Sequence, residues 1–150
     1  TGQQVVGVTA RTGVFGNTPI EVEDGGIVIF DLSGGGIATF IGGYWLPRWA
    51  GEAHWTIRGS ERWVHWDPDK KLEIHGPQQQ WYAMEEVFEI PPDHTFGYGG
   101  ARNKALVKDW LESAQTDGRP CRNTPQSAVD TLRLIDVIYQ SSKEGRRVDC

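Results

Sequence analysis

An aromatic loop at residues 42–55, "GGYWLPRWAGEAHW", carries the side chains best suited to ligand chemistry. Flat aromatic faces stack on sugar-like rings, and polar tips hydrogen-bond to the ring hydroxyls. The candidate substrate-binding residues of this loop are Tyr44, Trp45, Arg48 and Trp49, with His54 beside them. The alternative is that these aromatic residues only pack a hairpin end or a subunit interface.

A second candidate region lies just before a predicted helix, where Asp93, His94 and Tyr98 fall in irregular chain. Loops positioned by a rigid scaffold often carry functional side chains. We therefore add His94 and Tyr98 to the predicted substrate-binding set. A weaker hypothesis makes the protein a small isomerase or hydratase, in which His94 and a carboxylate act as acid and base.

The remaining histidines raise the question of a metal site. A turn that paired Trp66 with Lys71 would point the imidazoles of His65 and His75 to opposite faces of a hairpin. A bulge of one residue would bring them back to the same face. Because the chain contains no closely spaced pair of ligands, we predict no metal site.

Motifs for cofactors and nucleophiles are missing from the sequence. No G-x-G-x-x-G follows a strand, no Walker pattern occurs, and the glycines of "FGYGGARNK" suit a loop that leads into a helix. No G-x-S-x-G elbow occurs, and neither Cys121 nor Cys150 has a histidine placed to activate it. We predict that the chain has no catalytic residue and binds no dinucleotide by itself.

Composition narrows the function further. The chain has 150 residues, enough for one domain with a single core, and a formal net charge of -5. This acidic balance argues against nucleic acids and anionic membranes as partners. No apolar run reaches the roughly 18 residues of a membrane span. The cysteines, which lack CxxC spacing, are interpreted as reduced thiols, and a cytoplasmic protein is expected.

The first ninety residues are predicted to form about seven strands, mostly antiparallel because neighbours in sequence pair. The glycines of "LSGGG" predict a hairpin turn between two apolar runs. In the first strand, Val6, Val8 and Ala10 should share one face. The strand segments are "QQVVGVTARTGV", "GGIVIFDL", "GIATFIGGYW", "AHWTIRGS", "ERWVHW", "KLEIHG" and "WYAMEEVFEI".

Two helices are predicted in the last fifty residues. The first lies in "ARNKALVKDWLESAQTDG", where Gly118 suits the position just after its end. The second begins after the N-cap Thr124, with Pro125 at its first position, and ends at Gly145. Strands followed by helices indicate an α+β fold, a large and mostly antiparallel sheet with helices on one face. The open face is expected to bind another subunit, making a homo-oligomer. The apolar stripe of the second helix is predicted to comprise Ala128, Val129, Leu132, Ile135, Ile138 and Tyr139.

Three segments in this order resemble the C-terminal domain of the Gfo/Idh/MocA oxidoreductases, the family of glucose–fructose oxidoreductase and inositol dehydrogenase. "VEDGGIVIFDLSGGGIATFIGGYW" is similar to a family block with an acidic pair, a strand, a glycine turn and a second strand. "HWTIRGSERWV" resembles the next hairpin of that family, and "NTPQSAVDTLRLIDVIYQSSKEGRRV" resembles its closing helix. The three segments follow the family's order along the chain, and the last of them ends at Val148.

The resemblance implies that residues 1–150 form the substrate-binding and oligomerisation domain of an NAD(P)-dependent sugar or polyol oxidoreductase. It also implies that an N-terminal Rossmann domain, absent here, would hold NAD or NADP, so that this chain alone would be inactive. A chain that opens on "TGQQVVGVTA", already a strand, fits this expectation. The alternative is a self-standing, non-enzymatic module that binds a carbohydrate or a protein partner.

Overall fold

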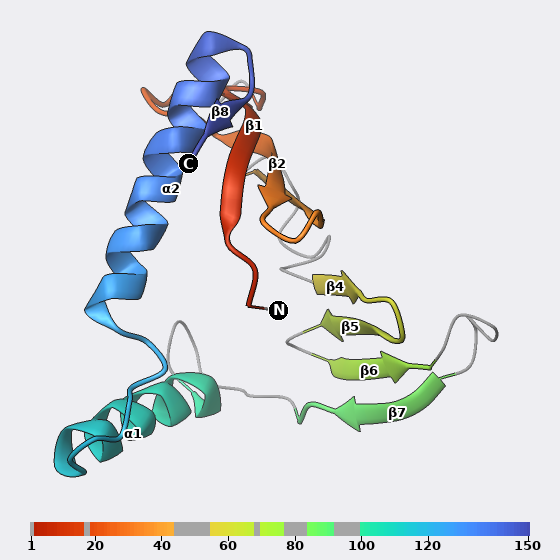
Figure 1. The fold of residues 1–150 in the computed structure, drawn as a ribbon, viewed down its shortest axis with the longest axis vertical. Coiled ribbons are helices and arrows are strands. Elements are labelled where there is room, and N and C mark those ends of the chain that lie inside the picture. The colour runs from red at the N-terminus through yellow and green to blue at the C-terminus, as the bar shows by residue number, and fades with distance from the viewer. Residues whose placement is uncertain (1, 17–18, 44–54, 68–69, 77–83, 92–99) are drawn as a thin grey trace. The chain divides into compact units, whose positions relative to one another are not determined.

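The computed structural model describes residues 2–16, 19–43, 55–67, 70–76, 84–91 and 100–150 (Figure 1). The chain divides into two compact units, one of Thr1–Pro47 with Asn123–Cys150, and one of Arg48–Arg122. The predicted α+β class and the antiparallel pairing are both confirmed. The described strands form two four-stranded antiparallel sheets.

The first unit contains the sheet β3-β2-β1-β8 and one helix. Its antiparallel ladder sets Val8 opposite Phe30 and Val28 opposite Phe40, and the turn of the β2–β3 hairpin has Gly35 at φ 81°. Such a positive φ favours glycine, as the "SGGG" turn predicted. The elements are β1 (Val5–Gly13), β2 (Gly25–Leu32), β3 (Ile37–Gly43), α2 (Pro125–Glu144) and β8 (Val148–Asp149).

The second unit contains the meander β4-β5-β6-β7 and one helix. All of its strand pairs are antiparallel sequence neighbours, as expected for hairpins linked in series. The elements are β4 (Trp55–Arg58), β5 (Trp63–Asp67), β6 (Lys71–His75), β7 (Met84–Glu89) and α1 (Ala101–Gln115).

A bulge near the start of β1 changes one predicted face. The register shifts between Val5 and Gly7, so Val6 is the extra residue and remains 39% exposed. Val5 packs against the core beside Val8 and Ala10 in its place. The prediction that Val6 shares their face was therefore wrong, since strict alternation fails where a bulge inserts a residue.

Helix α2 has the ends that the sequence predicted. The Thr124 side chain accepts a hydrogen bond of 3.1 Å from the backbone N–H of Ser127, Pro125 occupies the first turn, and Gly145 closes the helix in the left-handed conformation with φ 66°. These are the cap geometries that favour Thr, Pro and Gly at the three positions.

The face that α2 turns toward the sheet differs from the predicted stripe. The residues packed against the core are Leu134, Val137 and Ile138, whereas Leu132 is 61% exposed. Only Ile138 belongs to both sets. Apolar residues lie around much of this helix, so periodicity alone could not select the side that meets β1.

Two serines of α2 fix that side. Ser141 is fully buried, and its Oγ accepts a 3.0 Å hydrogen bond from the Ala10 N–H and donates one of 2.7 Å to the Arg146 carbonyl. Ser142 Oγ accepts a 2.9 Å bond from the Thr12 N–H. Strand β8 pairs β1 only at Gly7 and Val8, so the serines satisfy edge N–H groups that β8 does not reach.

Replacement of Ser141 by alanine should destabilise the first unit by about 2 kcal/mol, because it leaves a buried N–H and a carbonyl without partners. Chemical denaturation of Ser141→Ala measures the change. Ser127→Ala is the matched control, since it removes an exposed serine hydrogen bond from the same helix and should stay within about 0.5 kcal/mol. Equal losses in both variants would contradict this account of Ser141.

Candidate functional site

The register of β5 against β6 determines which side chains meet in the second unit. Asp67 pairs with Lys71 and Trp66 with Leu72, so the register differs by one residue from the Trp66–Lys71 pairing considered from the sequence. The segment between the strands holds three residues instead of four. Because strand side chains alternate between faces, this shift places His65 and His75 on the same face.

On that face a line of polar side chains crosses three strands. Thr56 on β4 lies opposite His65, and its Oγ1 is 3.2 Å from His65 Nδ1. Glu73 on β6 lies opposite His65 from the other side, and Lys71 Nζ is 2.5 Å from Glu73 Oε1. The arrangement places a donor ammonium, an acceptor carboxylate and an imidazole next to one another on one face of the sheet.

His75 ends this line in an unusual environment. Its ring stacks on Trp63 with centroids 3.6 Å apart and planes inclined by 6°. The residue is only 8% exposed, and its Nε2 is 3.7 Å from Glu73 Oε2, too far for a hydrogen bond. Both ring nitrogens are buried without a hydrogen-bond partner, unlike the other buried side-chain nitrogens and oxygens of the described residues.

Lys71 and Glu73 each stabilise the charged form of the other. The hydrogen bond and the charge of Lys71 hold the pKa of Glu73 below its ordinary value, with smaller contributions from His65 and His75, while partial burial of Glu73 acts in the opposite direction. Reciprocally, the hydrogen bond and charge of Glu73 raise the pKa of Lys71. Glu73 is therefore an ionised acceptor and Lys71 a cationic donor at neutral pH.

The opposite face of this sheet is apolar. Trp55 and Trp66 stack there with ring centroids 6.4 Å apart, and they border a shallow hollow of about 410 Å³. Ile57, Val64 and Leu72 complete its lining. With almost no polar lining, the hollow suits packing against apolar surface better than binding hydroxyl groups.

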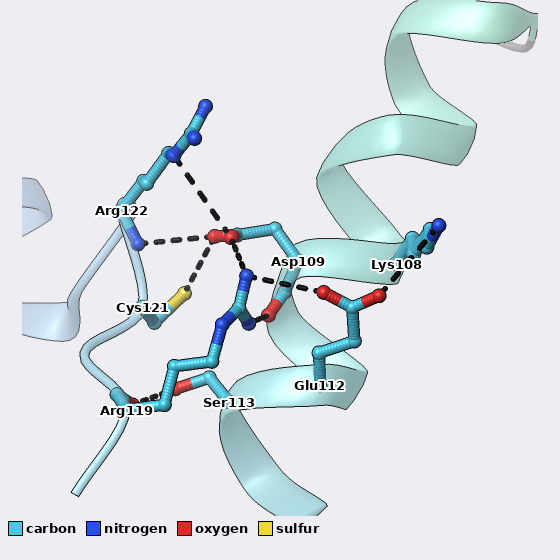
Figure 2. A network of polar contacts seen from close by, with 7 residues as sticks. All are labelled: Lys108, Asp109, Glu112, Ser113, Arg119, Cys121 and Arg122. Carbon is cyan, nitrogen blue, oxygen red and sulfur yellow. Dashed lines mark hydrogen bonds and ion pairs between the residues drawn. The ribbon is translucent and has the colours of Figure 1, made fainter. Parts of the chain in front are cut away.

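A second polar cluster surrounds Asp109 of α1 and has a structural role (Figure 2). Asp109 Oδ2 accepts hydrogen bonds from the Arg122 N–H at 3.1 Å and the Cys121 thiol at 3.7 Å, while Oδ1 binds the Arg119 guanidinium at 2.9 Å. Arg119 also lies 3.1 Å from Glu112 Oε2. These contacts lower the pKa of Asp109, chiefly through the Arg122 N–H, and fold the segment after α1 back onto the helix.

The predicted substrate-binding residues Tyr44, Trp45, Arg48 and Trp49 fall within residues 44–54, outside the described part of the chain. His94 and Tyr98 fall within residues 92–99, also outside it. All six stay predictions.

Sequence reasoning missed the cluster on β6 although its signal was readable. In "KLEIH", Lys71, Glu73 and His75 recur at every second position, which puts all three on one face of a strand. Trp63 and His65 lie on the same face as these three residues only because of the register between β5 and β6. If the pairing is misjudged by one residue, Trp63 and His65 are placed on the opposite face.

All strand pairs of the described residues are antiparallel, so these residues contain no parallel strand–helix–strand unit of the dinucleotide-binding type. Across the same residues, no cluster of three His, Cys, Asp or Glu side chains could hold a metal ion. None of the described helices is long and apolar enough to cross a membrane.

No family model matches the chain, and no curated protein matches its sequence. Solved structures do match its fold. An oxidoreductase from Agrobacterium radiobacter, solved with NAD+, L-tartaric acid and magnesium, is 21% identical with a TM-score of 0.74 over 97% of this chain and 43% of its own. Aldose-aldose oxidoreductase from Caulobacter crescentus, solved with glycerol, is 21% identical with a TM-score of 0.73 over 99% of this chain and 42% of its own.

Levoglucosan dehydrogenase, solved with NADH and levoglucosan, is 13% identical with a TM-score of 0.79 over 97% of this chain and 45% of its own. The chain therefore spans less than half the length of these matched chains. At such identities the likeness establishes a shared fold, and it confirms the oxidoreductase-domain fold that the sequence resemblance implied.

The Lys71–Glu73 pair should stabilise the second unit across neutral pH. A depressed Glu73 pKa adds stability that is present above the ordinary value of 4.5 and is lost as the pH falls through the folded value. A raised Lys71 pKa adds stability that is lost only as the pH rises above 10.5. Unfolding by denaturant at pH 3 and pH 7 should show a smaller difference in Lys71→Met than in the wild type.

Lys70→Met is the matched control, because Lys70 is 75% exposed at its side chain and pairs with Asp67 at the turn. Its pH dependence should match the wild type, since exposed ion pairs contribute little. If Lys70→Met reduces the pH dependence of the unfolding free energy as much as Lys71→Met does, the Lys71–Glu73 pair does not stabilise the second unit more than an exposed ion pair.

Proposed function

We propose that this chain is the C-terminal substrate-binding and oligomerisation domain of an NAD(P)-dependent sugar or polyol oxidoreductase of the Gfo/Idh/MocA type. The observation that carries the proposal is the fold shared along 97–99% of this chain with only 42–43% of two solved oxidoreductase chains. The sequence resemblance in three ordered segments supports it independently.

The cofactor belongs to another part of the enzyme in this proposal. A bound nicotinamide would exchange hydride with a hydroxyl-bearing carbon of the substrate, and this chain would bind and orient that substrate. The solved relatives hold NAD+ or NADH in chains more than twice as long. By itself this chain is inactive, and a cytoplasmic location fits its thiols.

Substrate hydroxyls would meet the polar face of β4–β6. Glu73 accepts hydrogen bonds, Lys71 donates them, and the half-buried setting of both strengthens such contacts relative to open water. The aromatic and polar side chains outside the described residues would add stacking and further hydrogen bonds. These are Tyr44, Trp45, Arg48, Trp49, His94 and Tyr98.

Titration calorimetry on the 150-residue chain should detect no binding of NAD+ or NADH at micromolar concentrations and should detect millimolar binding of a neutral polyol such as levoglucosan. Glu73→Gln should weaken the polyol binding about tenfold, because it removes a charge-assisted acceptor. Lys70→Met serves as the control with unchanged binding. Micromolar NAD+ binding would refute the proposal, and a self-standing binding module would be indicated if the chain proved to be encoded alone.

Assembly would use the open face of the first sheet. Helix α2 packs on the face that holds Val8 and Val28, and the other face presents four isoleucines to solvent. The register brings Ile27 opposite Ile41 on that second face. The four are Ile27, Ile29, Ile37 and Ile41, exposed by 53%, 41%, 72% and 61%. Contiguous apolar surface of this kind marks an association site.

Ile29→Glu should therefore shift the chain toward monomer, because it places a charge in the centre of the buried interface. Light scattering after size exclusion measures the molar mass. Val22→Glu is the control, since Val22 is 64% exposed but lies outside the sheet strands, and its mass should equal that of the wild type. A wild-type chain that is monomeric at high micromolar concentration would overturn the assembly proposal.

A further inference from the structure

Buried polar groups are nearly always hydrogen-bonded, and each exception needs an explanation. His75 leaves two ring nitrogens without a hydrogen-bond partner inside the fold, although Glu73 Oε2 lies 3.7 Å from its Nε2, close enough for an electrostatic contact. A structural role would be served better by an apolar ring, which would keep the stack on Trp63 without losing hydrogen bonds to water. The ring nitrogens of His75 therefore form no hydrogen bond within the described residues that would offset their burial, and the polar group near them is Glu73 at 3.7 Å.

The place of His75 in the sheet offers a second observation. The ladder between β6 and β7 is regular from Lys71 to Ile74, and its register shifts between Ile74 and His75. His75 pairs with Met84 and Ile74 with Glu86, so one residue of β7 is unpaired beside it. Bulges occur next to active sites, where they redirect a side chain or end the pairing, and they disrupt the ladder of hydrogen bonds locally.

The charges around His75 indicate what it can bind. An anion would be repelled by Glu73 Oε2, 3.7 Å from the imidazole, and Lys71 is already engaged by the same carboxylate. A neutral imidazole offers one donor and one acceptor, which match a hydroxyl group because a hydroxyl has both. The acidic residues placed on this face by the register, Asp67, Glu73 and Glu89, outnumber the basic residues Arg58 and Lys71.

We propose that His75 is a ligand-binding residue whose ring nitrogens hydrogen-bond a hydroxyl of a neutral polyol, with Trp63 and the bulge holding the imidazole in place. This rests on the proposed function and adds the residue and the charge class that select the substrate. Because both nitrogens are buried in this structure, binding requires the pairing of β6 with β7 to open at His75, the position where the register shifts. The hydrogen-bonding capacity that the His75 ring leaves unused in the fold is then available to the ligand.

The deciding variant is His75→Phe, which keeps an aromatic ring on Trp63 and removes only the polar atoms. It should raise Tm by about 3 °C, because two unsatisfied buried atoms disappear. It should also weaken levoglucosan binding about tenfold, the loss of roughly one hydrogen bond. His75→Gln, which retains a donor and an acceptor, should recover part of the binding.

His65→Phe is the matched control, being the same substitution on the same face. His65 has a partner in Thr56, so its loss should lower Tm instead of raising it. L-tartrate, a dianion, should bind the wild type more weakly than levoglucosan does. In ¹⁵N-histidine spectra, the ring signals missing from His75→Phe identify His75, and levoglucosan should shift them in the wild type.

The outcomes separate this inference from the proposed function. If the wild type binds levoglucosan while His75→Phe binds equally well and the His75 ring signals do not move, the inference is overturned and the proposed function stands. Tighter binding of L-tartrate also overturns it. If the wild type binds neither levoglucosan nor glycerol, the substrate-binding role of this chain fails and the inference fails with it. Should His75→Phe not fold, the wild-type ring signals and the tartrate comparison still decide.

Discussion

The alternation of side chains along a β-strand is the constraint on which the candidate site depends. With a period of two, the pairing of Asp67 with Lys71 sends His65, Glu73 and His75 to one face. It sends Trp66 and Leu72 to the other face, where they border the apolar hollow. A slip of one residue between β5 and β6 would send the two histidines to opposite faces. The length of the segment between these strands therefore determines whether the polar side chains share one face.

The first unit is organised by a different contact, the insertion of two serine hydroxyls into the edge of β1. An edge strand needs partners for its outward N–H groups, and β8 supplies them for only part of its length. Ser141 and Ser142 supply the rest, and they orient α2 so that Leu134, Val137 and Ile138 cover Val8 and Val28. The sheet face away from α2 then retains its isoleucines in solvent.

The two units also differ in how they treat buried polar atoms. Ser141 is fully buried and both of its hydrogen-bonding roles are satisfied, which is the pattern of a structural residue. His75 is almost as buried and satisfies neither. A buried residue with all its hydrogen bonds satisfied, such as Ser141, is expected in a scaffold. A buried residue that lacks them, such as His75, is expected where a protein sacrifices stability for binding.

The sequence by itself determined the α+β class, the hairpins, the glycine turn and the caps of α2, because these depend on local rules of periodicity, backbone conformation and end groups. Tertiary structure alone decided the β5–β6 register, the bulges beside Val6 and His75, and the side of α2 that meets the sheet. These depend on pairing between distant residues, and apolar residues around most of α2 gave no preference in advance. Lys71, Glu73 and His75 were visible as an alternating set in the sequence, but only the pairing with β5 brought Trp63 and His65 to them and left one imidazole buried without a partner.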